Sequence, residues 1–474
     1  MISHEKTPFA SNIPTHKHLR LARRHAHGGG GKGGVKGRKR LKNFAAMVTS
    51  HGSQWKSPPL PLGDRFPALD RPADDTRLAP ELPRVFVYEN LSVKLFPEPA
   101  QSSPKMEFAA VCKNIQAVNQ FGGAELVHHR LLSTSYRARS PAKADLYFVP
   151  MMLKSMRTLS NVKTSCARLR DVDVAGHLPH FNRHTAHRHF FFFSREHWAC
   201  QGCCAGWWSY PRGLLARSLR VAYSEVFPLE WRDGCCENRY MKQDPPYHGG
   251  VRVYPNLRSV PFFPAVPQAG KVPPWTSHEG RADILMLFVG NAGRGYHGDA
   301  QVRGRIAQQC AAYDDDAVCT HIRPKSPRFR KEKIALRDAI ELKKRAVFCL
   351  EPAGDTPFRK SFAESIVSGC IPVLFHPFQD YGFGWLWDGW REESRVLINR
   401  TAFVAGEVDL LAHLKRLPTE SVSRMQRTIE RRGRQFSVSC DADDRSDYFG
   451  LMLRGLSAQA DRSESGLLTK GSRS

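Results

Sequence analysis

The sequence predicts an α/β fold in two halves, because short apolar runs alternate with helical patterns twice along the chain. A proline-rich stretch, "VPFFPAVPQAGKVPPW" (Val260–Trp275), separates the two alternating blocks. Strands that alternate with helices belong to βαβ units and therefore to parallel sheets. With 474 residues, the chain is long enough for two or three domains with a sizeable core.

The first half contains three runs that are rich in β-branched and aromatic residues and one helical pattern. The predicted strands are Arg84–Asn90, Ala144–Pro150 and Arg188–Ser194, and the predicted helix is Glu107–Ser135, with a break at "FGG". The stretch from Ala199 to Pro274 is rich in Cys, Trp, Pro and Gly and has little periodicity. No element is predicted there.

The second half repeats the alternation. Strands are predicted at Ala282–Asn291, Arg345–Pro352, Cys370–Phe375 and Ser394–Asn399, and helices at Gln301–Cys310, Phe362–Ser368 and, in a basic segment, Glu407–Phe436. We therefore expect two Rossmann-like domains, residues 84–275 and 276–440, that face each other across a cleft. Residues 1–83 are predicted to be a basic arm and linker, and residues 441–474 a loose tail.

Charge favours anionic partners. The chain has 71 Lys and Arg against 45 Asp and Glu, a net charge of +26, which suits nucleotides, phosphosugars, nucleic acid or an anionic membrane face. The segment "GGGGKGGVKGRKR" is Gly-rich and basic and lacks the apolar residues that ordering requires, so we expect disorder. It is either an arm for nucleic acid or membrane, a solvated tail, or sequence upstream of the true start.

The sequence carries conflicting signals about the cellular compartment. No apolar run approaches the roughly 18 residues of a membrane-spanning helix, and the N-terminus lacks the apolar core of a signal peptide. However, Asn90 and Asn399 stand in glycosylation acceptor patterns, and the chain has 12 cysteines. The cluster formed by Cys200, Cys203, Cys204, Cys235 and Cys236 fits a zinc site, disulfides in a secretory lumen, or reduced buried thiols.

The most informative stretch is "AVFCLEPAGDTPFRKSFAESIVSGCIPVLF", Ala346–Phe375. Its first strand ends near Leu350, which places the following loop at the carboxyl edge of a sheet, where ligands of α/β proteins bind. Thr356 and Ser361 can cap the next helix or contact an oxygen ligand, and that helix start favours anions. Arg359 and Lys360 supply charge for a diphosphate, and Glu364 can accept hydrogen bonds from ribose hydroxyls. The alternative is an ordinary strand–loop–helix connection with surface cations.

Here the sequence resembles the exostosin family of glycosyltransferases. "FCLEPAGDTP" followed by "SGCIPVLF" is similar to the family's FCL-P-GDTP segment before GCIPV. Four further elements occur in the family's order, from about Arg84 to Leu414: "RSPAKADLYFVP", "HLPHFNRHTAHRHFFFFSREHW", "ILMLFVGN" and, downstream of it, Arg303.

The resemblance implies a GT-B-like fold in which the C-terminal half holds a nucleotide sugar, usually a UDP-sugar, and the N-terminal half a glycan acceptor. It implies transfer with inversion, no required cofactor or bound metal, and residence in the Golgi as a type II membrane protein. Because no anchor is visible, we expect an incomplete N-terminus or association with a membrane partner. The expected donor residues are Gly290, Asn291, Arg303, Gly354, Asp355, Thr356, Arg359, Lys360, Ser361 and Glu364. Asn182 and Arg183 are expected on the acceptor side, and His189 or Glu125 as the base.

The chain departs from the family pattern at several positions. Ser361 stands where many members have arginine, Arg188 where many have aspartate, and "GGVRVYPN" where an acidic residue is usual. A catalytically inactive, carbohydrate-binding relative is therefore the alternative function. A nucleic-acid-binding protein that acts through the basic N-terminus is a distant third alternative, and no nucleic-acid partner is expected, because the rest of the chain has no RNA-recognition or zinc-finger signature. "YDDDA" (Tyr313–Ala317) fits a metal-binding DxD motif less well than a solvated loop.

Overall fold

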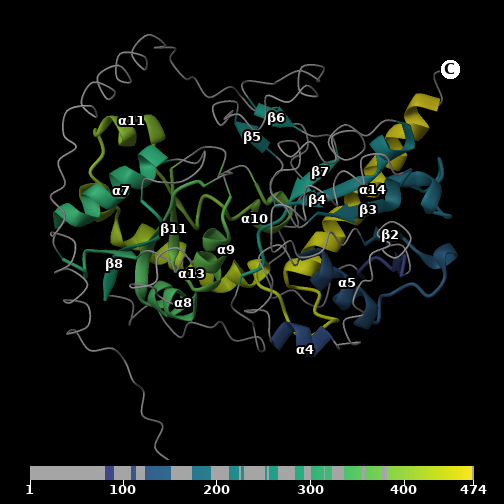
Figure 1. Ribbon diagram of the computed structural model, residues 1–474, viewed down its shortest axis with the longest axis horizontal. Coiled ribbons are helices and arrows are strands. Elements are labelled where there is room, and N and C mark those ends of the chain that lie inside the picture. Colours follow the sequence, from purple (N-terminus) through teal and green to yellow (C-terminus); the bar gives the residue numbers. More distant parts are fainter. Residues whose placement is uncertain are drawn as a thin grey trace, which may run out of the picture. The chain divides into compact units, whose positions relative to one another are not determined.

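The computed structural model describes residues 81–89, 108–113, 123–150, 173–193, 213–223, 226–228, 251–253, 256–264, 283–292, 300–313, 315–322, 336–354, 358–375, 379 and 382–471. All of them belong to one compact unit, Leu62–Lys325 with Ile334–Ser474 (Figure 1). The predictions for residues 1–80 and for the cysteine cluster at 200–236 lie outside the described residues.

The first sheet has five parallel strands in the order β1-β2-β3-β4-β7. They are β1 (Val85–Val87), β2 (Leu146–Val149), β3 (His189–Phe192), β4 (Leu219–Ala222) and β7 (Leu257–Ser259). The sequence predicts the first three correctly and misses the last two. The strands of this first sheet lie side by side in the same order as they occur along the chain.

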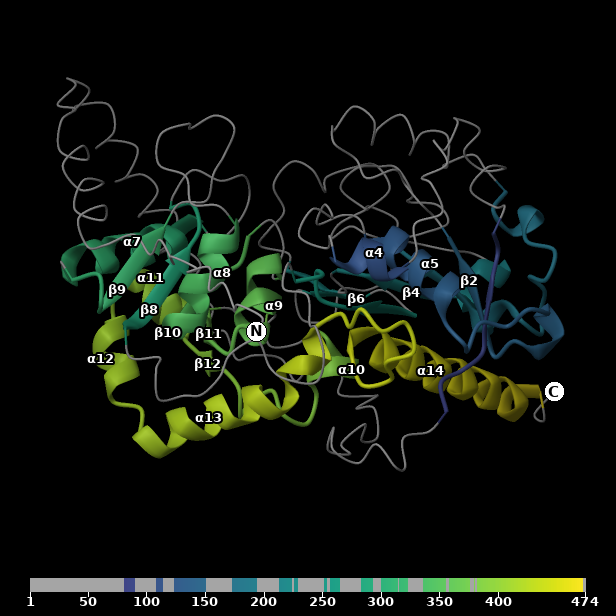
Figure 2. The same cartoon turned by 90° about the horizontal axis from the view of Figure 1, so that it is seen from below.

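Helices cover both faces of this sheet. Figure 2 shows α4 (Phe108–Lys113) and α5 (Gly123–Ser133) on one side of the strands and α14 (Tyr448–Gly471) on the other. The loose tail predicted for residues 441–474 is wrong where α14 forms. Seven apolar side chains of α14 recur at helical spacing and are buried, namely Tyr448, Phe449, Leu451, Met452, Leu453, Leu456 and Ala460. The polar composition near the chain end hides this apolar stripe.

Three kinds of bond attach the segment before α14 to the first sheet's helices. Arg130 of α5 forms an ion pair with Asp447 (2.5 Å), and both side chains are almost completely buried. Thr134 Oγ1 donates to Asp443 (2.6 Å), and a disulfide joins Cys112 of α4 to Cys440. The C-terminal segment is therefore an integral part of the N-terminal half.

The second sheet also has five parallel strands, in the order β12-β11-β10-β8-β9. They are β8 (Ile284–Val289), β9 (Cys319–Ile322), β10 (Ala346–Glu351), β11 (Ile371–Leu374) and β12 (Val396–Leu397). Numbered along this half, the order is 2-1-3-4-5, that of a flavodoxin-like doubly wound sheet. Two parallel α/β sheets confirm the predicted fold class, whereas the cleft between the halves stays a prediction.

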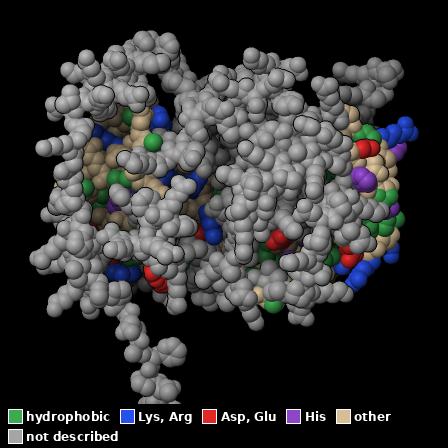
Figure 3. Space-filling model, in the orientation of Figure 1, with side chains coloured by type: hydrophobic (Ala, Val, Ile, Leu, Met, Phe, Trp, Pro, Cys, Tyr) green, Lys and Arg blue, Asp and Glu red, His purple; other side chains and the backbone are tan. Residues whose placement is uncertain are grey.

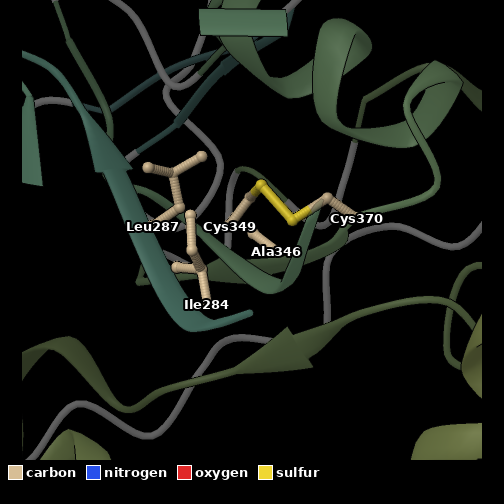
Figure 4. Close-up of a cluster of buried hydrophobic side chains, with 5 residues drawn as sticks. All are labelled: Ile284, Leu287, Ala346, Cys349 and Cys370. Carbon is tan, nitrogen blue, oxygen red and sulfur yellow. A yellow bond between two sulfur atoms is a disulfide. The ribbon is translucent and has the colours of Figure 1, made fainter. Parts of the chain in front are cut away.

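The helices of the second half are α7 (Ala300–Tyr313), α8 (Leu336–Arg345), α9 (Lys360–Val367), α10 (Gly384–Trp387), α11 (Arg400–Ala405), α12 (Leu410–Lys415) and α13 (Thr419–Arg432). Two disulfides lie here, Cys310–Cys319 between α7 and β9 and Cys349–Cys370 between β10 and the start of β11. The second of these packs with Ile284, Leu287 and Ala346 in the buried cluster of Figure 4.

The short elements complete the described chain. β5 (Val226–Pro228) and β6 (Val251–Val253) form an antiparallel ribbon. The 3₁₀ turns are Pro141–Lys143, Ala175–His177, Ala186–Arg188, Gly213–Arg217 and Gly433–Phe436. None of the helices in the described part of the chain is long and apolar enough to cross a bilayer.

Candidate functional site

The candidate site lies at the switch point of the second sheet. In a 2-1-3-4-5 sheet, strand order reverses between the first and third strands, here β8 and β10, and ligands bind beyond their carboxyl ends. Gly290 and Asn291 follow β8, and Pro352, Ala353 and Gly354 follow β10. The fold therefore brings together the two Gly-containing loops that the sequence singles out.

Arg303 of α7 joins these two loops. Its Nε donates to the carbonyl of Ala353 (2.8 Å) and its Nη2 to that of Pro352 (3.2 Å). Its Nη1 donates to the carbonyl of Asn291 (3.3 Å), and the guanidinium lies 5.8 Å from the centre of the Phe288 ring. Arg303 thus fixes the distance between the loops across the switch point. Its predicted contact with a phosphate stays a prediction.

Gly290 and Gly354 leave room for the side chains of Arg303 and Arg359, respectively. A Cβ on Gly290 would lie 2.8 Å from the Phe288 ring and 3.0 Å from Nη1 of Arg303. A Cβ on Gly354 would overlap the side chain of Arg359. Glycine at both positions therefore lets guanidinium groups lie directly on the backbone of the loops.

The start of α9 carries the other predicted cations. Arg359 is the N-cap residue of α9 and lies in an extended conformation, and Lys360 is its first helical residue. Lys360 Nζ lies 3.7 Å from Oε1 of Glu364, which is only 5% exposed. Arg359 and Lys360 are half-buried beside the loop after β10. Asp355 and Thr356, which complete the predicted set, lie outside the described residues.

Ser361 does not have its expected position. The sequence predicts that it caps α9 or contacts a ligand, but its hydroxyl points inward and donates to Glu351 Oε1 (2.9 Å). The buried ammonium of Lys343 lies 2.8 Å from the same hydroxyl. Neither Lys343 nor Glu351 is among the predicted site residues, because no helix is predicted over Leu336–Arg345 and Glu351 falls within the predicted strand Arg345–Pro352.

The end of α9 explains the "SGC" sequence. Gly369 has a φ of 74°, a left-handed conformation that favours glycine. The N–H groups of Gly369 and Cys370 donate to the carbonyls of Ile366 (2.9 Å) and Ser365 (3.0 Å). This Schellman motif ends the helix and turns the chain directly into β11.

Glu125 lies in the first turn of α5, at the carboxyl edge of the first sheet. Two residues before it, Gly123 packs so closely that a Cβ would lie 2.6 Å from Phe263 and 2.9 Å from Phe192, residues at or beyond the carboxyl ends of β7 and β3. Burial raises the pKa of Glu125, which makes its carboxylate a stronger base near neutral pH.

His189 occupies a different environment. It is the first residue of β3 and is fully buried, with its ring stacked on Tyr147 at 4.5 Å. Nδ1 donates to the carbonyl of Thr185 (2.8 Å), so Nε2 accepts from Tyr88 Oη (2.9 Å). Burial lowers the pKa of His189 to about 4. Its role as a base stays a prediction, and both ring nitrogens have protein partners.

Asn182 and Arg183, predicted on the acceptor side, are exposed in the turn that precedes β3. Asn182 Oδ1 accepts from the backbone N–H of His184 (2.9 Å), and the carbonyl of Arg183 accepts from Arg217 (2.7 Å). They therefore lie near the amino end of β3, whereas Glu125 lies near the carboxyl edge of the sheet.

In the acidic stretch Tyr313–Ala317, Tyr313 is the last residue of α7, and Asp316 and Ala317 lie in the turn before β9. Asp315 and Asp316 are exposed, and Asp315 Oδ1 accepts from the backbone N–H of Ala317 (2.9 Å). Within the described residues, no three His, Cys, Asp or Glu side chains are arranged to hold a metal ion.

Comparison with known families now identifies the chain. Residues 80–392 match the model of the exostosin GT47 domain. Because this match covers more than half of the sequence, the chain belongs to the exostosin GT47 family, and the resemblance found in its motifs is confirmed.

Several plant proteins are similar to parts of the chain. A probable xyloglucan galactosyltransferase of Arabidopsis thaliana is 31% identical over 28% of this chain and 28% of that protein. A probable glucuronoxylan glucuronosyltransferase of the same plant is 25% identical over 54% of this chain and 51% of that protein. A probable glucuronosyltransferase of Oryza sativa subsp. japonica is 24% identical over 81% and 84%. The chain thus spans about a quarter to a half of the first two relatives.

Among solved structures, a chain from the crystal structure of a GtfA/B complex matches with a TM-score of 0.28 and 10% identity, over 60% of this chain and 57% of that chain. This likeness is too weak to support an argument about the fold or the site.

Proposed function

We propose that this protein is a glycosyltransferase that moves a sugar from a nucleotide sugar, a UDP-sugar, to a polysaccharide or glycoprotein glycan. One observation carries the proposal: Arg303, Arg359 and the two Gly-containing loops converge at the switch point of the second sheet. Cations on glycine-containing loops beyond parallel strands suit a diphosphate, because each cation forms charge-assisted hydrogen bonds with phosphate oxygens.

The donor site stabilises the leaving group. As the bond between the sugar and the diphosphate breaks, negative charge develops on the diphosphate oxygen. Arg359 and Lys360 neutralise that charge, and the first turn of α9 presents the positive end of its dipole. Glu364 accepts hydrogen bonds from the ribose once Lys360 turns toward the phosphates. In this scheme side chains stabilise the diphosphate, and no metal is required.

The base comes from the first half. In an inverting transfer, the acceptor hydroxyl loses its proton as its oxygen forms the new bond to the anomeric carbon, opposite the departing diphosphate. We assign proton removal to Glu125, because its carboxylate is half-buried at the carboxyl edge of the first sheet and its pKa is raised. His189 instead positions Tyr88 and the turn at Thr185.

The relatives support a plant polysaccharide as the acceptor class, since their names specify xyloglucan and glucuronoxylan. Galactose and glucuronic acid are the sugars that those names give for transfer, and either is a candidate donor sugar here. Three disulfides in the described chain favour the oxidising lumen of the secretory pathway. Asn399, an exposed acceptor pattern at the start of α11, is compatible with that compartment.

The test combines turnover and binding. Purified protein is incubated with UDP-sugars and xyloglucan or xylan oligosaccharides, and released UDP is measured. Calorimetry with UDP then compares wild type with Arg359→Ala/Lys360→Ala, for which we expect affinity at least tenfold weaker. Each phosphate contact is worth roughly 1.5–3 kcal/mol, or about ten- to a hundredfold in affinity.

A matched control is available on α8. Lys344 and Arg345 are also adjacent cations, but they pair with Glu341 (2.8 Å) and Asp283 (2.9 Å) at the surface. Lys344→Ala/Arg345→Ala should leave UDP affinity unchanged. Equal affinity in both double variants and wild type would show that the loop after β10 is only a connection.

The inactive, carbohydrate-binding relative is the second candidate. It is favoured by Ser361, which stands where many family members have arginine and whose hydroxyl points away from the loop. Binding of UDP and oligosaccharide without release of UDP would favour this candidate over the enzyme.

A further inference from the structure

A buried polar cluster lies directly beneath the start of α9. Lys343 is 1% exposed and Glu351, the last residue of β10, is 4% exposed. Their charged groups form an ion pair with Nζ and Oε1 3.0 Å apart. Ser361 and Ser365, one turn apart on α9, complete the cluster.

The hydrogen bonds within the cluster form a closed network. Lys343 Nζ lies 2.6 Å from the carbonyl oxygen of Ser361, 2.8 Å from its hydroxyl and 2.7 Å from the hydroxyl of Ser365. Both hydroxyls donate to Oε1 of Glu351, at 2.9 Å from Ser361 and 2.6 Å from Ser365. The ammonium therefore has an acceptor for each of its three protons, which a buried charge requires.

The cluster connects three consecutive elements. Lys343 belongs to α8, Glu351 to β10, and the two serines to α9. The backbone carbonyl of Glu351 also accepts from Gln379 Nε2 (2.8 Å), whose Oε1 accepts from the backbone N–H of Phe375 after β11. The carboxyl end of β10 is thereby held through both the side chain and the backbone carbonyl of Glu351. Because the interior screens charges weakly, the ion pair resists movement of α9 away from β10.

The cluster adjoins the donor residues. Lys360 and Arg359 directly precede Ser361, and Glu364 directly precedes Ser365. We infer that Lys343 and Glu351 are positioning residues for the donor site: their ion pair holds the first turn of α9 at the end of β10 and so sets the direction of Arg359, Lys360 and Glu364. This inference rests on the proposed function.

The test measures UDP affinity by calorimetry and donor and acceptor KM by UDP release, at a temperature below every variant's thermal transition. For Lys343→Met we expect UDP affinity at least tenfold weaker and a similarly raised donor KM, with the acceptor KM unchanged. Ser365→Ala removes one hydroxyl and keeps the ion pair. It should fold and weaken UDP binding about threefold, so the inference stays testable if Lys343→Met does not fold.

The buried pair of Arg130 and Asp447 provides a matched control, because it is equally buried but lies at the first sheet. Asp447→Asn should lower the unfolding temperature and leave UDP affinity within twofold of wild type. If Lys343→Met or Ser365→Ala loses no more UDP affinity than Asp447→Asn, the cluster only stabilises the fold and the inference is overturned. If wild type binds neither UDP nor another nucleoside diphosphate, the proposed function fails, and the inference fails with it.

Discussion

The two sheets of this protein are alike in the number and direction of their strands but differ in strand order. Each has five parallel strands, but those of the first sheet lie in the order in which they are synthesised, whereas β8 and β10 of the second lie side by side with β9 outside. Reversal of strand order creates a crevice between the helices that leave the two strands in opposite directions. Arg303, which joins the loops after β8 and β10, lies at this point of reversal.

The two sheets are also stabilised by different parts of the chain. The second sheet fixes its loops with its own residues, through Arg303 and the Lys343–Glu351 pair. The first sheet depends on the C-terminal segment, through Asp447 and Cys440. Figure 3 adds that the described Lys and Arg side chains visible on that face occur in several separate places, so position in the fold is more informative than net charge.

The largest effect is expected at Glu125. Glu125→Gln keeps size and removes the base, so kcat should fall by about 10²–10⁴ while UDP affinity stays the same. Initial rates and calorimetry measure the two quantities. Glu89→Gln is the control, because Glu89 is an exposed carboxylate paired with Arg137 in the same half. Weaker UDP binding by the Glu125 variant would contradict the proposal that the base lies at the first sheet and the donor site at the second.

The next effect is on stability. Asp447→Asn leaves the guanidinium of Arg130 in a buried site without its counter-charge, which should cost about 3–5 kcal/mol in the free energy of unfolding. Denaturant titration measures it. Arg434 forms a more exposed pair with Asp444, so Arg434→Gln should cost much less. Equal losses would mean that the attachment of the C-terminal segment does not depend on the buried pair.

A smaller effect is expected at the bridge of the second sheet. Arg303→Ala removes the three hydrogen bonds that the guanidinium donates to the loops after β8 and β10. We therefore expect UDP affinity to fall about ten- to a hundredfold. Arg305, on the same helix, donates to Gln308 (3.3 Å), and Arg305→Ala should bind UDP like wild type. Normal affinity in the Arg303 variant would show that the loops keep their spacing without it.

The smallest effect is expected on the pH dependence of stability, through His128 of α5. Burial lowers the pKa of His128 to about 4, below the ordinary value of 6.5. Because His128 binds a proton more weakly in the folded than in the unfolded protein, protonation of His128 favours unfolding. The free energy of unfolding is therefore unaffected by His128 above pH 6.5 and decreases as the pH falls toward 4. His128→Phe should match wild type at pH 7.5 and exceed it by about 1–2 kcal/mol at pH 5. Thermal unfolding at both pH values measures it, and equal pH dependence would exclude His128 as the cause.

Much of the fold could be predicted from the sequence because buried parallel strands form continuous apolar runs. "LYFV" in β2 and "VFCL" in β10 are examples. β9 could not be predicted, since an edge strand with the sequence "CTHI" has no such run. The sequence does not predict α14, because its apolar stripe lies next to polar residues. Its burial depends on a sheet whose last strand, β7, ends at Ser259, far earlier in the chain than Tyr448.

The candidate site was predictable only in outline. A loop with cations after a strand indicates a ligand, and Arg359 and Lys360 do lie beside that loop. The direction of Ser361 and the role of Lys343 could not be predicted, because both depend on how α8 and α9 approach β10. Likewise, the first-sheet location of Glu125 follows from the contacts of Gly123, which a sequence pattern does not show.

The ion pair between Arg130 and Asp447 has a consequence for biosynthesis. The two residues are 317 positions apart, and at about 5–20 residues per second a ribosome needs roughly 16–60 seconds to progress from one to the other. During that time α5 carries a cation without its counter-ion. The second sheet, whose bridging residues all lie between 291 and 379, can form before translation ends. The half that leaves the ribosome first is therefore completed last.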